Sequence, residues 1–250
     1  MKHYIGMISS DWSQCLSPSG PFDAFEFHYP EIESELRHIF KCYTSNEISL
    51  RKAVGRVKGI LPAPLTTDQM DDYLENCFEI YKGVDELIHW CREHHILFMI
   101  NTTGFMGYFQ RILAKSLLPP VTVLSAQSML RFSQGQNDPE KMIDLFEIED
   151  KATNTAAIAR MYQISPENII LMGDSGGDGP HFEWGARVGA TLVGSMTKSS
   201  LMTYCRDRGV LIDHLFGHTY AQSEKISLEK ERSFDFRKLS DIIAQVMGID

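Results

Sequence analysis

The sequence is poor in cysteine, in long apolar runs and in positive charge. Its five cysteines among 250 residues are scattered and odd in number, and none is spaced as C-x-x-C. This pattern argues against a disulfide framework and against a structural zinc site, and it favours reduced thiols. No run approaches the roughly 18 apolar residues that a membrane-spanning helix needs. The first residues contain no long apolar stretch typical of a secretory signal, so we expect a cytoplasmic protein.

Acidic residues outnumber basic ones, at 33 to 24, which gives a formal net charge of −9. An acidic chain is a poor partner for nucleic acid or for an anionic membrane, so we expect neither as the main partner. Hydrophobic residues make up 43% of the chain. A chain of this length and composition can bury a core in one domain, or in one domain with a small insert. The oligomeric state is left open.

Short apolar runs alternate with helical patterns along most of the chain. This alternation predicts an α/β fold with a Rossmann-like parallel sheet and crossover helices, because strands buried on both faces are continuously apolar. A polar tract at 217–234 is predicted to be irregular. The predicted strands span 3–8, 96–100, 121–125, 168–172 and 190–194, and the predicted helices span 84–94, 106–118, 152–163 and a C-terminal segment at 236–246.

Residues 17–82 interrupt the alternation directly after the first strand. The stretch "SPSGP" is typical of a linker, and three helices are then predicted, one after Pro30, one over about 46–58 and one ending near Phe78. Thr66 and Gln69 have the spacing of a capping box at the start of the third helix. We therefore expect a small all-helical cap at 17–82 inserted into a core of 1–16 and 83–250.

Polar residues gather where the predicted strands end. Ligands of open parallel sheets bind beyond the carboxyl ends of the strands, so these residues are expected to converge. Several carboxylates without histidine or thiolate suit a hard cation such as Mg²⁺, and a lysine with a hydroxyl beside them suits a phosphoryl group. The candidates are Asp11, Thr102, Thr103, Asp174, Asp178 and Lys151, with Lys141 as a rival to Lys151.

The stretch "GDSGG" at Gly173–Gly177 resembles the nucleophile loop of trypsin-like serine proteases. A protease of that class needs two antiparallel barrels, which the alternation of strands and helices disfavours. No histidine and aspartate partners accompany Ser175 in a recognisable pattern. We therefore expect Ser175 to shape its loop, and the two flanking aspartates to form part of the site.

The order of Asp11, Thr102, Lys151 and the GDxxxD segment from Gly173 to Asp178 resembles the motifs of the haloacid dehalogenase (HAD) superfamily. The stretch "YKGVDELIHWCREHHILFMINTTGF" and the spacing from Lys151 to Asp174 most resemble its phosphoserine phosphatase branch. The resemblance implies a Rossmann-like core with a helical cap, a bound Mg²⁺ and hydrolysis of a small phosphorylated metabolite.

The resemblance also implies a role for each motif residue. Asp11 would be the nucleophile that forms an aspartyl-phosphate. Thr102, assisted by Thr103, would hydrogen-bond the phosphoryl oxygens, and Lys151 would neutralise the charge on Asp11 and the phosphoryl group. The Mg²⁺ ligands would be Asp11, Asp174, Asp178 and the backbone carbonyl of Ser13, and Ser13 would also contact the substrate.

The first motif departs from the family pattern of DxDxT or DxDxV. Here it reads Asp11-Trp12-Ser13-Gln14-Cys15, so Ser13 stands where family phosphatases carry the aspartate that protonates the leaving oxygen. A serine hydroxyl cannot donate a proton comparably, and losing a general acid typically costs about 10²–10⁴ in rate. That loss is small when the leaving group is already stable as an anion, as in acyl phosphates.

Two other functions are therefore kept open. The Asp11-Trp12 pair and the "TTG" segment also resemble phosphonoacetaldehyde hydrolase, a carbon–phosphorus hydrolase that needs a cap lysine, for which Lys52 and Lys58 are candidates. A catalytically weakened relative could instead bind a phosphoryl ligand or a protein partner. The basic cap residues could grip an anionic substrate or form a solvated helix face; they are Arg51, Lys52, Arg56 and Lys58.

Overall fold

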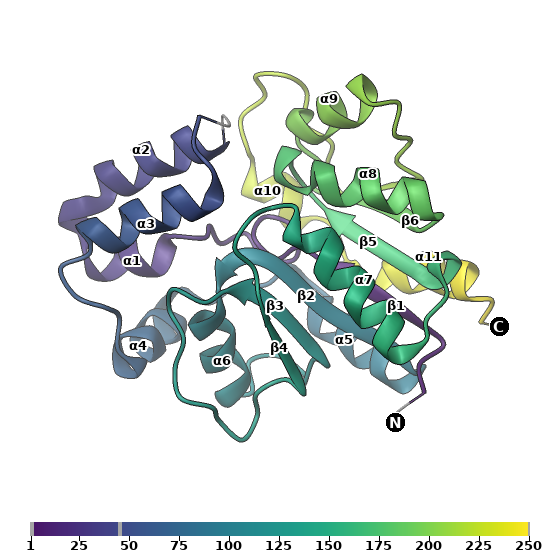
Figure 1. The fold of residues 1–250 in the computed structure, drawn as a ribbon, viewed down its shortest axis with the longest axis horizontal. Helices are drawn as coiled ribbons and strands as arrows, with labels where there is room; N and C mark the ends of the chain where they lie inside the picture. The colour runs from purple at the N-terminus through teal and green to yellow at the C-terminus, as the bar shows by residue number, and fades with distance from the viewer. Residues whose placement is uncertain (1–2, 45–46, 250) are drawn as a thin grey trace.

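A seven-stranded sheet forms the centre of the protein in the computed structural model, which describes residues 3–44 and 47–249 (Figure 1). The strand order is β4-β3-β2-β1-β5-β6-β7, and every pairing is parallel. This confirms the predicted α/β class with a Rossmann-like parallel sheet. The strands are β1 Gly6–Ser10, β2 Ile96–Phe105, β3 Val123–Gln127, β4 Lys141–Asp144, β5 Ile169–Gly173, β6 Thr191–Ser195 and β7 His214–Phe216.

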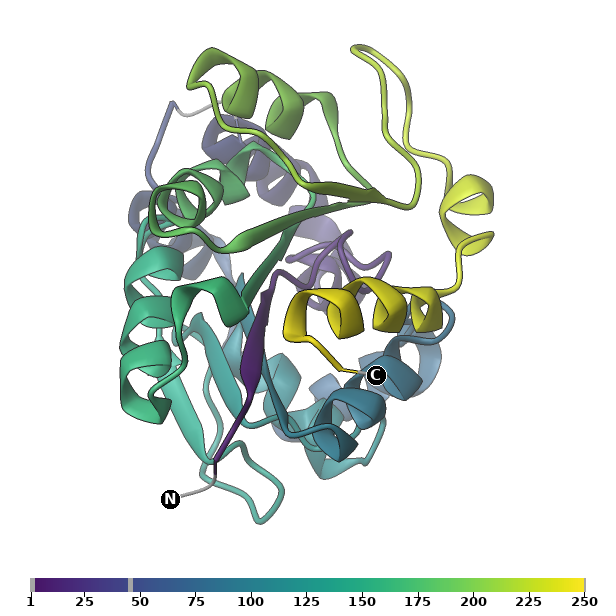
Figure 2. The same ribbon diagram turned by 90° about the vertical axis from the view of Figure 1, so that its right-hand side faces the viewer.

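Helices cover both faces of this sheet (Figure 2). Alternate residues of a strand point to opposite faces, so Ile8 packs into one apolar cluster and Met7 into the other. None of the helices within the described ranges is long and apolar enough to cross a membrane. One face carries α5 Val84–Glu93, α6 Met106–Ala114 and α11 Leu239–Met247, and the other carries α7 Asp150–Tyr162 and α8 Gly179–Val188, with α9 Ser199–Asp207 packed beside α8.

The segment between β1 and α5 is helical, and its helices lie together on the left of Figure 1. Thr66 and Gln69 form the predicted capping box at the start of the last helix. The expected helix over 46–58 begins at Leu50, and its expected first residue, Asn46, lies outside the described residues. The helices are α1 Asp23–His28, which was not expected, α2 Glu33–Thr44, α3 Leu50–Ile60 and α4 Thr67–Cys77. The division into a core and a cap at 17 and 82 remains a prediction.

Ion pairs connect these helices to the rest of the molecule. Arg111 of α6 donates two hydrogen bonds to Asp71 of α4, at 2.7 and 2.8 Å. Lys115 follows α6, and its Nζ lies 2.8 Å from the carboxylate of Glu75, which is also in α4. Paired contacts from two successive turns of α4 hold that helix in one orientation against α6, and thereby orient the segment beside the sheet.

The strands at the two edges of the sheet, β4 and β7, were not predicted from the sequence. The edge strands β4 and β7 are short and partly exposed, so they lack the apolar run that marks a buried strand. The expected strand at 3–8 begins at Gly6, and the one at 96–100 continues to Phe105. The tract expected to be irregular contains the short helix α10 Leu228–Arg232. Single 3₁₀ turns, η1 to η4, span Pro30–Ile32, Pro166–Asn168, Gly176–Asp178 and Phe236–Lys238.

The chain reverses its direction across the sheet between β1 and β5. From β1 it proceeds outward through β2, β3 and β4, and from β5 it proceeds to the opposite edge. The loops that follow β1 and β5 must therefore diverge, which opens a crevice at their carboxyl ends. Asp11 comes directly after β1, and Asp174 comes directly after β5.

Gly83 lies just before α5, where the chain returns to the sheet, in a conformation that other residues rarely adopt. We therefore predict that Gly83→Ala destabilises the protein. Its φ of 84° lies in the left-handed region, and a Cβ would lie 2.6 Å from Asp235 Oδ1 and 2.9 Å from the Arg237 backbone nitrogen. We expect the free energy of unfolding in urea to fall by about 2 kcal/mol.

The control is Gly55→Ala in α3, where no atom lies within 4 Å of the added Cβ. Alanine in an exposed helix should leave stability unchanged or raise it by about 0.5–1 kcal/mol. An equal effect of both substitutions would contradict the assigned conformation of Gly83.

Candidate active site

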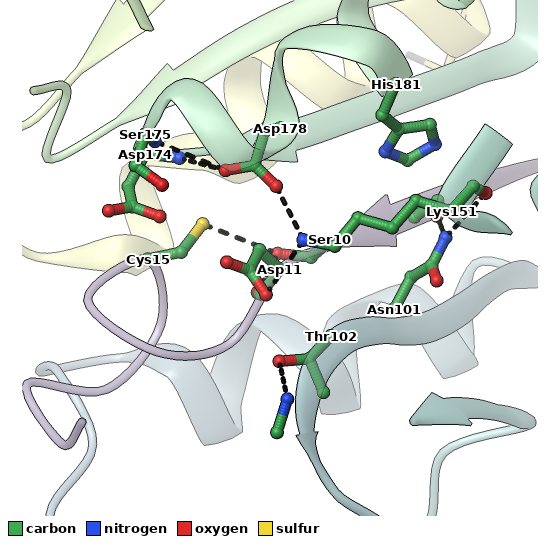
Figure 3. A network of polar contacts seen from close by, with 12 residues as sticks. Ser10, Asp11, Cys15, Asn101, Thr102, Lys151, Asp174, Ser175, Asp178 and His181 are labelled. Atoms are coloured by element: carbon green, nitrogen blue, oxygen red, sulfur yellow. Dashed lines mark hydrogen bonds and ion pairs between the residues drawn. The ribbon is translucent and has the colours of Figure 1, made fainter. Parts of the chain in front are cut away.

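Three buried carboxylates meet at the crevice between β1 and β5 (Figure 3). Asp11, Asp174 and Asp178 each offer one oxygen within 4.8 Å of the others. Their exposed fractions are 8%, 1% and 1%. Like charges this close and this buried repel one another strongly, so the group needs cations beside it.

Lys151 supplies the first of these cations. It is the second residue of α7, and its Nζ lies 2.6 Å from Asp178 Oδ1 and 3.2 Å from Asp11 Oδ1. Burial by itself would lower the pKa of the ammonium group, but Asp11 and Asp178 raise it above its usual value. Lys151 is therefore permanently charged at neutral pH. The rival Lys141 is exposed at the start of the edge strand β4, and therefore lies at the amino ends of the parallel strands rather than at their carboxyl ends.

Asp178 uses both carboxylate oxygens within the protein. Oδ1 accepts from Lys151, and Oδ2 accepts from the backbone N–H groups of Asp174 at 2.9 Å and Ser175 at 3.2 Å. Burial opposes ionisation, but the Lys151 ion pair and these hydrogen bonds lower the pKa of Asp178 overall. Gly173 permits the close approach, because a Cβ there would lie 2.5 Å from Asp178 Cγ.

Asp11 and Asp174 are less well compensated. Burial raises the pKa of Asp11 although Lys151 counteracts it, and burial raises the pKa of Asp174 to about 7. Charged oxygen ligands without imidazole or thiolate form a donor set for a hard cation. The residues present therefore fit Mg²⁺, because protein groups neutralise the negative charge on Asp11 and Asp174 only in part.

A second lysine, which sequence reasoning missed, lies against Asp174. Lys198 follows β6, and its Nζ lies 2.5 Å from Asp174 Oδ2 and also contacts the side-chain oxygen of Gln14. The backbone N–H of Lys198 donates to the Asp174 carbonyl at 2.7 Å. The signal in the sequence was its place shortly after the predicted strand at 190–194, because residues after that strand also reach the crevice.

The "NTTG" segment lies inside β2 rather than after it, because the strand continues to Phe105. Thr102 is buried, and its hydrogen bonding partly counteracts the rise in the pKa of Asp11 that burial causes. Its hydroxyl also accepts from the Gly104 N–H at 3.1 Å. Thr103 is half-buried and faces Tyr43 of α2, whose pKa burial raises to about 12. Tyr43 is thus a further phenol beside the site that the sequence did not reveal.

Ser13 and Trp12 line a pocket next to Asp11. Ser13 pairs with Ser17 in an isolated β-bridge. Trp12 is buried and packs edge-on against Phe109, with ring centroids 5.3 Å apart. Its indole nitrogen and the Tyr108 hydroxyl are buried without a well-formed hydrogen bond to any described residue, although Trp12 and Ser19 lie close enough to that hydroxyl to counteract the rise in the pKa of Tyr108. The other aromatic residues that line the pocket are Phe25, Tyr73, Phe105, Tyr108 and Phe109.

The remaining candidates lie away from the acid cluster or have local roles. The Ser175 side chain caps the 3₁₀ turn η3, consistent with a loop-shaping residue. Arg51 lies 3.7 Å from the Glu147 carboxylate. Lys52, Arg56 and Lys58 are exposed on α3, as expected of a solvated helix face.

A buried network fixes the start of α7 and thereby the position of Lys151. The Asn101 side chain donates to Lys151 O at 2.9 Å and to Thr155 Oγ1 at 3.1 Å. Thr155 Oγ1 also lies 2.9 Å from His181 Nε2. Burial lowers the pKa of His181 to about 3. The imidazole is therefore neutral at pH 7, and the network carries no additional positive charge beside Lys151.

We predict that His181 makes the protein sensitive to acid. An unfolded histidine binds a proton near pH 6.5, whereas the folded one does so only near pH 3, so stability falls as the pH drops between these values. Between pH 7 and pH 5 this contributes about 2 kcal/mol of lost unfolding free energy. His181→Gln, whose amide can replace the hydrogen bond, should show a correspondingly smaller loss in urea unfolding at both pH values. An unchanged pH dependence would contradict the assignment.

Comparison with known proteins places the fold. No family model matches the sequence, and no curated protein matches it. Among solved structures, a phospho-aspartyl intermediate analogue of phosphoserine phosphatase superposes with a TM-score of 0.63 at 15% identity, covering 96% of this chain and 99% of that one. A substrate-bound phosphoserine phosphatase gives a TM-score of 0.65 at 15% identity, over 95% and 97% of the two chains.

A HAD family hydrolase of Salmonella enterica serovar Typhi gives a TM-score of 0.63 at 15% identity, covering 86% of this chain and 67% of that one. Sequence identity is low throughout, whereas the coverage of both phosphoserine phosphatases is nearly complete. The chain therefore has the fold of the phosphoserine phosphatases and HAD family hydrolases.

Proposed function

We propose that the protein is a Mg²⁺-dependent phosphohydrolase that acts on a small phosphorylated metabolite through an aspartyl-phosphate. The observation that carries the proposal is the arrangement of Asp11, Lys151 and Asp178 in one buried ion-paired array, with Asp174 beside it. An array of this kind at the carboxyl ends of two strands offers a nucleophilic carboxylate and a fixed positive charge for a phosphoryl group.

In the proposed reaction an Asp11 oxygen attacks phosphorus, and the bond from phosphorus to the leaving oxygen breaks. Lys151 neutralises charge on Asp11 and on the incoming phosphoryl oxygens, and Thr102, with Thr103 beside it, donates hydrogen bonds to them. Asp178 holds Lys151 in place. Water then cleaves the aspartyl-phosphate, which releases phosphate and restores Asp11.

The ligands of Mg²⁺ would be Asp11, Asp174, the backbone carbonyl of Ser13 and Asp178. Asp178 would contribute mainly by orienting the loop, because protein donors already engage both of its oxygens. The bound ion would neutralise negative charge on the phosphoryl group and thus favour attack by an anionic carboxylate.

The leaving group would lie beside Ser13 and Trp12, which also line a narrow aromatic pocket. The pocket has a volume of about 20 Å³, which is room for one water molecule, so a leaving group could enter it only by displacing the aromatic side chains. Ser13 offers no general acid, so the leaving oxygen takes its proton from water, which favours substrates such as acyl phosphates. The exposure of Lys52 and Lys58 gives no support to carbon–phosphorus hydrolysis through a cap lysine.

We predict that Asp11→Asn abolishes Mg²⁺-dependent phosphate release from acetyl phosphate and p-nitrophenyl phosphate. Loss of the nucleophile should lower kcat by about 10³-fold or more, because the amide cannot form the acyl phosphate. Rates are compared with the buffer rate, with MgCl₂ and with EDTA.

The matched control is Asp207→Asn, which makes the same change at an exposed carboxylate and should keep full activity. Turnover by Asp11→Asn at the wild-type rate, or no turnover by the wild type on either substrate, would refute the proposed function.

We predict that Ser13→Asp raises turnover of an alkyl phosphate far more than that of acetyl phosphate. A restored general acid should increase the alkyl phosphate rate about 10–10³-fold, whereas acetyl phosphate needs no proton on its leaving group. Ser13→Asn, which has similar size but no acidic proton, is the control. A loss of activity in Ser13→Asp on both substrates would indicate that the reaction requires a small residue at this position.

A further inference from the structure

Lys198 occupies a position that the reaction proposed above does not require. Its ammonium group bridges the carboxylate of Asp174 and the amide oxygen of Gln14, whereas Lys151 pairs with Asp11 and Asp178. Gln14 follows Ser13, whose carbonyl is the remaining proposed Mg²⁺ ligand. The ammonium group therefore lies between the two parts of the chain that a divalent cation would join.

The backbone has an uncommon left-handed conformation near both partners of the Lys198–Gln14 contact. Six non-glycine residues among those described have positive φ; they include Gln14 at 58°, which is one partner in the contact, and Met196 at 46°, which lies two residues before Lys198. His95, Ser116 and Gln163 lie at the ends of α5, α6 and α7, where left-handed residues are common, and Ser223 lies in a turn. Gln14 and Met196 instead follow β1 and β6, and strained residues of this kind persist where surrounding contacts hold them.

The charges in the cluster show what Lys198 does there. Within the described part of the chain, three carboxylates of the cluster face two ammonium groups, those of Lys151 and Lys198. Lys151 forms ion pairs with Asp11 and Asp178, and Lys198 forms the ion pair with Asp174. We propose that Lys198 is a tethered cation that takes the place of the divalent metal at Asp174, so that Mg²⁺ must displace its ammonium group in order to bind. This inference rests on the metal site of the proposed function.

The local structure allows this displacement without unfolding. The Lys198 backbone is fixed by its N–H bond to the Asp174 carbonyl, and α9 begins at the next residue. Its side chain is 24% exposed, whereas that of Asp174 is 2% exposed. The flexible side chain can therefore turn toward solvent while the carboxylate stays in the crevice, and the site alternates between an internal and an external cation.

The first test measures Mg²⁺ affinity by isothermal titration calorimetry on EDTA-treated protein. Lys198→Met keeps the length of the side chain and removes the competing charge, so we expect its Kd for Mg²⁺ to fall about tenfold relative to wild type. Gln14→Asn tolerates positive φ but is too short to reach the ammonium group, so we expect a smaller decrease in the same direction.

The matched control for these variants is Lys115→Met. It removes the same charge and a 2.8 Å ion pair, with Glu75, outside the acid cluster, and should leave the Kd for Mg²⁺ unchanged. A Kd for Lys198→Met equal to or higher than that of wild type would overturn the inference. So would the absence of Mg²⁺ binding in both proteins.

The second test uses wild-type protein and does not depend on the folding of any variant. Acetic anhydride labelling with mass spectrometry measures the reactivity of each lysine, with MgCl₂ or with NaCl at equal ionic strength. We expect Mg²⁺ to raise acetylation of Lys198 several-fold and to leave Lys115 unchanged. Equal labelling of Lys198 in both salts would overturn the inference.

These results are separable from the fate of the proposed function. Tighter Mg²⁺ binding by Lys198→Met without any phosphate release would support the tethered cation and refute the phosphatase. Mg²⁺-dependent turnover by the wild type, together with an unchanged Kd for Mg²⁺ in Lys198→Met, would support the phosphatase and refute the tethered cation.

Discussion

The buried array of Asp11, Lys151 and Asp178 is the constraint on which the site depends. Moving each of these charges out of water costs several kcal/mol, and removing one partner of such a pair costs about 3–5 kcal/mol because it leaves a buried charge uncompensated. The array therefore tolerates only one geometry, in which β1, β5 and the start of α7 meet. Asn101 and Thr155 reinforce that geometry by bonding the first turn of α7.

The same electrostatic requirement explains the chemistry that we propose. Lys151 compensates two of the three carboxylates, and the remaining charge at Asp174 calls for another cation. Either Lys198 or a divalent ion can neutralise Asp174, and they differ in charge, because the ammonium group carries one positive charge and the divalent ion carries two. Ser13 restricts the reaction separately, because the site contains a nucleophile and counter-ions but no general acid at that position to protonate the leaving group.

Much of the fold was predictable from local pattern. Strands buried on both faces need apolar side chains at every position, and this made the five central strands visible as continuous runs. The edge strands β4 and β7 and the short helix α1 escaped notice because partial burial and short length leave no such pattern. Strand order followed from no local signal, since pairing depends on contacts between distant segments.

For the site, the sequence by itself determined which residues follow the strands: Asp11, Asp174 and Asp178, with a lysine at the head of a later helix. Any parallel sheet brings such residues to one edge, so their convergence could be expected. Only the tertiary structure decided that Lys151 rather than Lys141 reaches them, that both Asp178 oxygens are engaged, and that Lys198 lies on Asp174. The reason is physical: hydrogen bonds and ion pairs act over about 3 Å, and only folding sets distances on that scale between residues far apart in the chain.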